Sequence, residues 1–519
     1  MRLNDNYQEN RNQSLQENGN HFPNKALTEL DAKPKYAFAA QRWLPYVRSV
    51  NEAHVVMLCE QGILKPAEAA RILEAIENLD YGKYRTQGYS GEYEDIYMQQ
   101  EPEIIQASGG AAGNMHLGRS RNDMCVTWTH LNVREGILDV TEHLVKFQNT
   151  VRLFCREHKD TLYVIHTHTQ HAQPGILGHY FLGFLDVLDR DILRFRRAYD
   201  LTNVSPMGAA VATTSAYPVS RERVAELLGC DGFIENAYDS IGNIEHYLSA
   251  ASAVSLCAID LSKTITDMLL WATEEENMII LGEGLCSISS IMPQKRNPIV
   301  LEHLRACLGV AKGLGDTVTN GFFRTPYGDI CDYEDVDDTL FSAFSMLNRC
   351  LDVFDSVIAT MDVNKPLLQK RAFESFSVVT EMADEMYRSY GIPFRKAHGF
   401  VSSLVRTARK DGYDLRVVSK EYFGQFYEKY FGEPFTFDFS PIVQAIDPEH
   451  FVKVREIPGG TGPKAMEAQL LSADRKIKGN AAWLEEKTAK LKASDELRLQ
   501  AVARIISAGL NEEKESAGV

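Results

Sequence analysis

The run VTWTHLNVREGILDVTEHLVKFQNTVRLFCRE, at residues 126–157, is the feature from which the architecture of this chain follows. Almost no glycine or proline interrupts the run, so it predicts one long helix. Comparable helical runs follow at 175–203, 241–275, 297–314 and 339–360. Because long helices dominate and few alternating strand patterns occur, we predict a mainly α protein with a central bundle of long helices.

The rest of the chain is arranged around this bundle. Residues 1–30 are polar and have no apolar period, so they predict a disordered N-terminal segment. We predict an N-terminal helical domain over 31–123, the central bundle domain over 124–366 and a small C-terminal helical domain over 367–480. Residues 481–519 form a charged, partly amphipathic tail, for which a surface or interface helix and a solvated tail are both open interpretations.

Composition narrows the class of protein. The 519 residues carry a formal net charge of −16, which argues against nucleic-acid or anionic-membrane binding, since both need a basic surface. No apolar run approaches the roughly 20 residues of a transmembrane helix, and the N-terminus lacks an apolar signal core, so we expect a cytoplasmic protein. The nine cysteines form no CxxC pair, and no His/Cys cluster has zinc-ligand spacing, so we expect reduced thiols and no metal.

Three polar segments, far apart in the sequence, are too specific in composition for ordinary loops. They are HLGRSRND at 116–123, THTQHAQP at 167–174 and SISSIMPQKRNP at 287–298. In the first segment, Arg121 and Asn122 precede a long helix, and guanidinium and amide groups suit carboxylate oxygens; a capped helix start with solvated arginines is the alternative. In the second, His168 lies among hydroxyl and amide groups and is able to move a proton near neutral pH, unless it is simply solvated.

The third segment carries the strongest chemical signal. A serine hydroxyl is a poor base in water and needs nearby positive charge and backbone N–H groups to hold an alkoxide. Lys295 and Asn297 follow Ser289 closely enough for a folded loop to bring the three together. The alternative, a flexible loop before a helix, does not readily explain the run from Met292 to Pro298.

These segments resemble a known family. Ser289 to Pro298 resembles the signature of the aspartase/fumarase superfamily, and Gln294 favours its argininosuccinate lyase branch. Residues 116–123 are similar to that branch's HTGRSRND, and residues 167–174 to its THLQRAQP. Further blocks that fit lie at 206–223, 393–398 and 459–461. The resemblance covers the chain from about Tyr36 to about Gln469.

The resemblance implies a three-domain, mainly helical subunit in a homotetramer, with each active site shared by three subunits and with no cofactor. It implies that Ser289 removes a proton beside a substrate carboxylate, and that Lys295 and Asn297 stabilise the resulting dianion. His168 matches a helper histidine, and Glu302 matches its acidic partner. The implied contacts to a small dicarboxylate substrate are Asn51, Asp95, Ser120, Arg121, Asn122, Thr167, Ser290 and Tyr327.

Several positions depart from the argininosuccinate lyase pattern. Ile288 stands where a glycine precedes the serine pair, and a β-branched residue does not easily adopt positive φ. Asn51 replaces an expected serine. In the stretch from Tyr327 to Asp335, spacing places Asp332 and Asp335 where the family has glutamine and lysine that hold the leaving group. Acids there favour a cationic leaving group, unless the acidic loop is shifted and never meets the substrate.

We therefore predict a carbon–nitrogen lyase that eliminates fumarate from an N-substituted L-aspartate by reversible anti elimination. The expected leaving group is a non-standard amine, such as an aminopolycarboxylate of the ethylenediamine disuccinate type or another cationic amine. Argininosuccinate lyase proper is the first alternative. A non-catalytic, crystallin-like structural homologue is the second.

Overall fold

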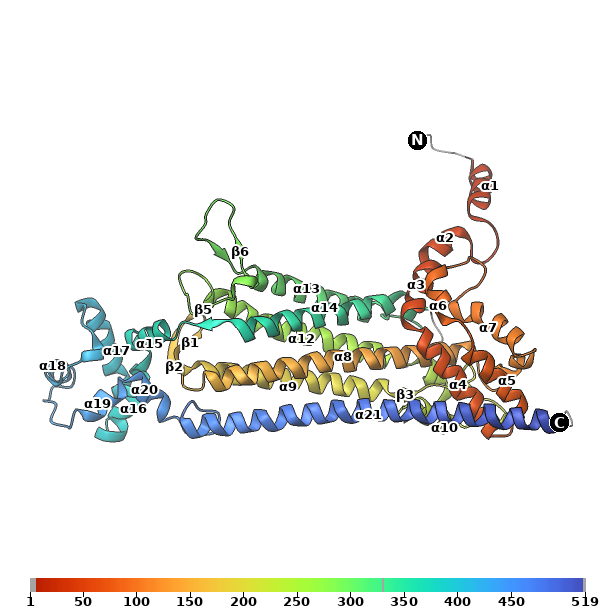
Figure 1. The fold of residues 1–519 in the computed structure, drawn as a ribbon. Coiled ribbons are helices and arrows are strands. Elements are labelled where there is room, and N and C mark those ends of the chain that lie inside the picture. The colour runs from red at the N-terminus through yellow and green to blue at the C-terminus, as the bar shows by residue number, and fades with distance from the viewer. Residues whose placement is uncertain (1–5, 329–330, 517–519) are drawn as a thin grey trace.

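A bundle of five long helices forms the centre of the molecule (Figure 1). The computed structural model describes residues 6–328 and 331–516. The bundle confirms the predicted mainly α fold with long central helices, although α14 begins seven residues before the expected 339. The five helices are α8 (Arg121–Glu157), α9 (Leu177–Thr202), α12 (Glu245–Trp271), α13 (Ile299–Gly321) and α14 (Asp332–Thr360).

Close packing explains the one glycine in the long α8 sequence. A Cβ atom on Gly136 would lie 2.7 Å from the ring of Phe344 on α14, so only glycine lets the two helices approach at this point. Phe147 on α8 packs against Phe354 on α14 with ring centroids 4.9 Å apart, and both rings are buried. Helix α12 is long and apolar enough to cross a membrane by length and composition alone, but it packs between α9 and α13 inside the bundle.

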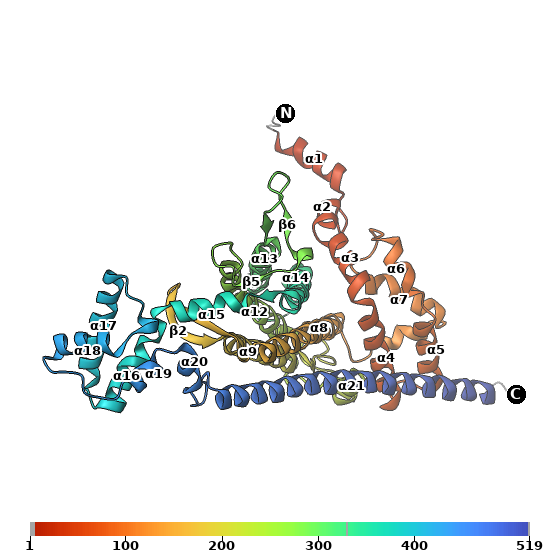
Figure 2. The ribbon, with the colours of Figure 1, turned by 60° about the vertical axis from the view of Figure 1, so that its left-hand side comes forward.

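Two smaller helical regions lie at opposite ends of the bundle (Figures 1 and 2). The N-terminal region holds α3 (Lys33–Arg42), α4 (Leu44–Glu60), α5 (Pro66–Glu77), α6 (Tyr81–Gln87), α7 (Ile96–Ala107) and η2 (Ala111–His116). The C-terminal region holds α15 (Lys365–Glu374), η4 (Phe376–Val378), α16 (Val379–Tyr390), α17 (Phe394–Asp411), η5 (Leu415–Val417), α18 (Lys420–Phe431), α19 (Ser440–Ala445) and α20 (Pro448–Lys453).

Short elements connect the long helices. Two antiparallel hairpins, β1–β2 (Leu162–Thr167 and Gln170–Ile176) and β6–β7 (Ser287–Ile288 and Arg296–Asn297), contain two of the polar segments. The remaining pairs are β3–β4 (Val204–Ser205 with Gly232–Phe233, parallel) and β5–β8 (Ile279–Ile280 with Asp362–Val363, antiparallel). The remaining short helices in this part of the chain are α10 (Arg221–Leu227), α11 (Ala237–Gly242) and η3 (Glu283–Leu285).

The N-terminal segment differs from the expected disorder. Helix α1 (Tyr7–Asn18) is capped by Asn6, whose side chain accepts hydrogen bonds from the backbone N–H groups of Gln8 and Glu9. None of its side chains is buried, which accords with the low apolar content that suggested disorder. Helix α2 (Lys25–Leu27) and η1 (Thr28–Ala32) then lead into α3. Low apolar content predicts only that the segment has little to bury, whereas a cap such as Asn6 stabilises a helix locally. Residues 1–5 lie outside the described residues.

The C-terminal tail is one continuous helix, α21 (Pro463–Ser516), of 54 residues. It crosses the predicted domain boundary at 480 and runs along the whole bundle to the N-terminal region (Figure 1). Trp483, Val502 and Ile505 are buried on its inner face. Of the two interpretations left open for this tail, the structure has the packed helix; residues 517–519 are not described.

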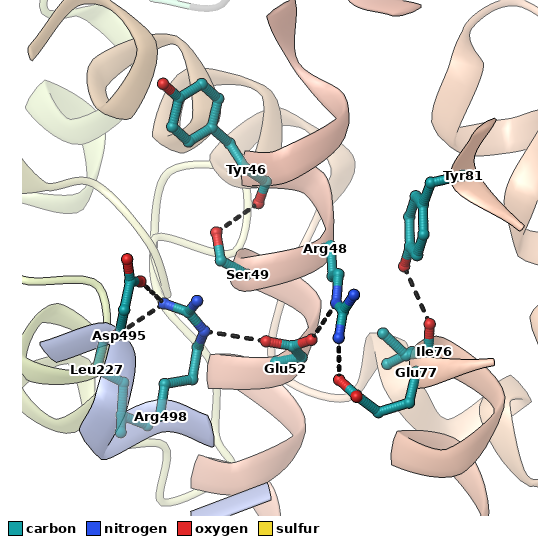
Figure 3. Close-up of polar contacts among 10 residues, drawn as sticks. All are labelled: Tyr46, Arg48, Ser49, Glu52, Ile76, Glu77, Tyr81, Leu227, Asp495 and Arg498. Carbon is teal, nitrogen blue, oxygen red and sulfur yellow. Dashed lines mark hydrogen bonds and ion pairs between the residues drawn. The ribbon is translucent and has the colours of Figure 1, made fainter. Parts of the chain in front are cut away.

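A buried ion-pair network fastens α21 to the N-terminal region (Figure 3). The Glu52 carboxylate on α4 accepts from Arg498 Nε of α21 at 2.9 Å and from Arg48 Nε at 2.6 Å. The Glu52 side chain is 1% exposed, so its charge depends on these two arginines. Arg48 also binds Glu77, and Arg498 also binds Asp495.

We expect Glu52→Gln to lower the free energy of unfolding by about 3 kcal/mol, because two partly buried guanidinium groups lose their shared counter-ion. Denaturant unfolding followed by circular dichroism measures the change. The matched control is Glu29→Gln, because Glu29 forms an exposed pair with Lys33 and should change stability by less than about 0.5 kcal/mol. Equal stability of the two variants would contradict this role for the network.

A second buried carboxylate predicts a pH effect. Burial raises the pKa of Asp191 from 3.8 to about 7, and the nearby charge of Asp260 adds to this rise. The charge of Arg194 opposes the rise but does not cancel it. The folded-state pKa lies above the unfolded one, so the contribution of Asp191 to stability is complete at low pH and is lost as pH rises through about 7. We expect Asp191→Asn to reduce the fall in thermal midpoint between pH 5.5 and pH 8.5. The exposed-site variant Asp200→Asn should keep the full fall, and a full fall in Asp191→Asn would refute the assignment.

Candidate active site

A cavity of about 430 Å³ lies where the N-terminal region meets the bundle. Its walls come from η1 and α3, from the residues before α7, and from the first turns of α8 and α14. It brings together four of the predicted site residues, Asp95, Arg121, Asn122 and Asp335. The other lining residues are Phe22, Pro23, Leu27, Leu30, Asp31, Ala32, Lys35, Glu94, Cys125, Cys331, Tyr333 and Glu334.

Arg121 is the first residue of α8, and acids surround it. Its Nη1 group donates to Glu94 and lies 3.5 Å from the Asp95 carboxylate. Burial opposes the charge of Arg121, but Glu94 and then Asp95 outweigh burial and raise its pKa. Asp95 is buried and also caps α7, since its Oδ1 accepts from Met98 N–H at 2.8 Å. The carboxylates therefore hold the guanidinium in a fixed orientation at the cavity.

A capping box holds the start of α8. Ser120 Oγ accepts from Asn122 N–H, and Asp123 accepts from Ser120 N–H at 2.7 Å. The second oxygen of Asp123 accepts from Gly208 N–H at 2.9 Å, which ties the segment 206–211 to this corner. Ser120, predicted as a substrate contact, thus serves as a helix cap and does not line the cavity.

Asn51 also does not line the cavity. It lies on α4 with a fully buried side chain. Near it, His54 contacts the backbone oxygen of Leu117 through Nε2 at 3.0 Å. The contact of Asn51 with substrate stays a prediction, since the single chain places this side chain in the buried interior and outside the cavity lining.

The segment 167–174 forms the tip and second strand of the β1–β2 hairpin. Thr167 ends β1, and His168 and Thr169 make the turn with φ of 52° and 59°. Both predicted residues, Thr167 and His168, are exposed. Their hairpin displays them to solvent instead of enclosing them in a site within this chain.

Ser289 lies at the start of the loop between β6 and β7. Its Oγ accepts from the backbone N–H groups of Met292 at 3.1 Å and of Ile291 at 3.4 Å. These donors are of the kind that an alkoxide at this position needs. Asn297 donates to Ser287 Oγ at 3.2 Å across the hairpin, and Ser290 and Lys295 are exposed on the loop.

Ile288 is accommodated without strain because it lies in strand β6 and not in a positive-φ turn. Its side chain is 82% exposed and that of Ile291 is 84% exposed, so the hairpin tip presents apolar surface. Glu302, predicted as the partner of His168, is exposed in the first turn of α13.

Tyr327 and the acids that follow it occupy different places. Tyr327 donates its hydroxyl to Asp239 at 2.6 Å, and this bond, with burial and charge, raises the pKa of Tyr327 to about 12. Asp332 and Asp335 lie in the first turn of α14, not in a loop; residues 329–330 between them and Tyr327 lie outside the described residues. Asp335 lines the cavity, whereas Asp332 does not.

Glu334 and Lys35 were missed from the sequence, although both line the cavity and bind one another. The run of acids at 332–335 is typical of the first turn of a helix. If the helix expected at 339–360 is extended back to these acids, helical spacing places Cys331 and Asp335 on one face. Nothing in the sequence pairs Lys35 with a residue 299 positions away.

The segments that hold the predicted residues thus lie toward opposite ends of the bundle, with the start of α8 at one end and the β1–β2 and β6–β7 hairpins at the other (Figure 1). Arg121 begins α8, and His168 follows the far end of that helix. The helix has 37 residues, which at ~1.5 Å per residue is about 55 Å. Ser289 lies on a hairpin at the same end as His168 (Figure 1). One chain therefore cannot bring Arg121 to His168.

Comparison with known proteins defines the class. Residues 36–313 match the family model described as lyase, and residues 376–453 match the argininosuccinate lyase C-terminal model. Argininosuccinate lyase of Methanocaldococcus jannaschii is 33% identical over 448 residues, which cover 86% of this chain and 91% of that protein. Argininosuccinate lyase 2 of Agrobacterium fabrum is 32% identical over 86% of this chain and 89% of that protein.

Among solved structures, EDDS lyase in complex with formate matches with a TM-score of 0.79 and 28% identity, over 92% of this chain and 96% of that one. The fold and the three polar segments thus define a fumarate-lyase type of protein. The chain belongs to the aspartase/fumarase superfamily as an argininosuccinate lyase-like member, as its sequence resemblance indicated. Its enzyme class is that of the fumarate-releasing carbon–nitrogen lyases. This class favours a catalytic protein over the non-catalytic structural homologue.

Proposed function

We propose that this enzyme reversibly eliminates fumarate from an N-substituted L-aspartate whose leaving amine is cationic. One observation carries the choice of amine. The cavity that holds Arg121 and Asn122 is lined by five carboxylates and only two cationic side chains. The carboxylates are Asp31, Glu94, Asp95, Glu334 and Asp335, and the cations are Lys35 and Arg121. An excess of negative charge stabilises a positive leaving group and repels an exposed carboxylate.

In this proposal, Ser289 as alkoxide takes the proton from the carbon beside a substrate carboxylate. The electron pair of that C–H bond is first delocalised into the neighbouring carboxylate, which gives a transient dianion. The pair then forms the double bond of fumarate as the C–N bond breaks on the opposite face, with the electrons of that bond staying on nitrogen. Met292 N–H stabilises the oxygen of Ser289, and the Lys295 ammonium and the Asn297 amide are the donors for the transient dianion. Arg121, Asn122 and Thr167 hold the carboxylates, and His168 with Glu302 assists proton movement.

We further propose a cytoplasmic homotetramer in which three subunits complete each site. The separation of Arg121 from His168 along α8 supports this arrangement. The apolar tip of the β6–β7 hairpin, with Ile288 and Ile291 exposed, also supports it, since such residues are usually covered by another surface.

A second candidate is the cleavage of argininosuccinate. It is favoured by relatives of that name at 31–33% identity. The acids at Asp335 and Glu334 argue against it, because the α-carboxylate of arginine would meet negative charge there. The structural neighbour named EDDS lyase, at 28% identity over 92% of this chain, supports the first proposal, because it is a lyase of this fold that is not named for argininosuccinate.

The reverse reaction gives the direct test. We expect the enzyme, incubated with fumarate and a panel of amines, to consume fumarate with cationic amines and to consume it faster than with arginine. Loss of the ultraviolet absorbance of fumarate, with the adduct identified by mass spectrometry, measures the reaction. If no amine, arginine included, yields an adduct, the proposal fails; if arginine is the best partner, the second candidate replaces the first.

Two serine variants make that assay specific. Ser289→Ala should reduce kcat by about 10²–10⁴-fold, the range for loss of a general base. Ser262→Ala, the same change on the exposed side of α12, should leave kcat unaltered. Undiminished activity in Ser289→Ala would refute its assignment as the base.

Sharing of sites between subunits predicts complementation. Arg121→Ala and Ser289→Ala should each be nearly inactive alone, since each variant lacks one group in every site. When the two variants are co-expressed in equal amounts, the mixed oligomers should regain up to about a quarter of wild-type activity. In about one site in four, an Arg121→Ala chain supplies the intact Ser289 and a Ser289→Ala chain supplies the intact Arg121. Inactive mixed oligomers, verified by two affinity tags, would mean that one chain supplies both residues.

A further inference from the structure

The Lys35–Glu334 ion pair joins α3 to α14 at the wall of the cavity. Lys35 Nζ contacts Glu334 Oε2, and the two side chains are only 16% and 11% exposed. The pair lies at the junction of two spaces. Lys35, Glu334, Asp31 and Asp335 line both the 430 Å³ cavity and an adjoining one of about 870 Å³ between α3 and α14.

Each member of this pair shifts the pKa of the other. Burial works to lower the pKa of Lys35, but Glu334 and, more weakly, Asp95 outweigh it and raise that pKa. Burial raises the pKa of Glu334, and Lys35 opposes that rise. Removing either partner would leave the other buried without a counter-ion. The Lys35 ammonium is therefore the counter-ion of the Glu334 carboxylate at the wall of this cavity.

A lysine side chain is an alkyl ammonium on a flexible four-carbon stem. The terminal ammonium of an alkyl diamine is the same chemical group. The cavity thus already holds, through its own chain, the kind of cation that a diamine leaving group would bring to it. Asp31 and Asp335 lie beside this position, and their charges add to that of Glu334.

We infer that Glu334 is the counter-ion for a second ammonium group on the leaving amine, and that Lys35 is a built-in competitor for the same carboxylate. This inference rests on the proposed function and narrows it to diamines and polyamines. In the bound diamine, one nitrogen lies where it forms the C–N bond of the aspartate adduct. Its distal ammonium shares or takes over the contact with Glu334. Lys35 and Glu334 are thus specificity residues and take no part in proton transfer.

The test uses three amines of matched length with fumarate: 1,4-diaminobutane, n-pentylamine and 4-aminobutanoate. The wild-type enzyme should rank them in that order by kcat/KM. Glu334→Gln should lower kcat/KM for the diamine by at least about tenfold, raise it for 4-aminobutanoate and change it little for n-pentylamine. Lys35→Gln should act in the opposite direction, with a lower KM for the diamine and a higher KM for 4-aminobutanoate.

Opposite signs separate a specificity role from damage to the fold, which would lower all three rates together. Lys33→Gln is the control, since Lys33 carries the same charge on the same helix but forms only an exposed pair with Glu29; it should leave the ratio of diamine to pentylamine unchanged. Ratios that stay unchanged in both pocket variants, or a wild-type preference for 4-aminobutanoate, would overturn the inference while leaving the lyase proposal intact. No adduct from wild-type enzyme with any amine would instead refute the proposed function itself.

Discussion

Helix α8 carries Arg121 in its first turn and leads, after its last turn, into the hairpin that displays His168. An α-helix is stiff and rises by ~1.5 Å per residue, so its 37 residues hold these two groups far apart. Four further long helices lie beside it, and α8 packs closely against α14 where Gly136 meets Phe344. The rigid bundle thus presents one set of polar groups at each end.

That geometry has a chemical consequence. A serine base requires donors and positive charge around its oxygen, and a substrate carboxylate requires a cation held in place. The β6–β7 loop offers Ser289 its own backbone N–H donors, whereas the opposite end offers Arg121 braced by Glu94 and Asp95. Each end is preorganised separately, and assembly of several chains is the arrangement that would join them.

The cavity around Arg121 is electrostatically unusual because acids outnumber cations in a partly buried space. Such a space is costly unless counter-ions enter it. Lys35 provides one from within the chain, and α21 with Arg498 provides another for Glu52 at a different corner of the same region. The N-terminal region is therefore held together by buried ion pairs between segments that lie hundreds of positions apart. Its stability depends on this type of interaction.

Local pattern determined much of this protein. The long helices, the polar segments at 116–123, 167–174 and 287–298, and the family to which the chain belongs were all predictable, because periodicity and contiguous motifs are local properties of a sequence. Burial and partners were not predictable. Asn51 became a core residue, Ser120 a helix cap and Asp332 a residue outside the cavity, while Glu334 took a place on its wall. Only the tertiary structure decided these, because contacts such as Lys35–Glu334, 299 residues apart, arise when whole helices pack, and no local pattern encodes which faces will meet.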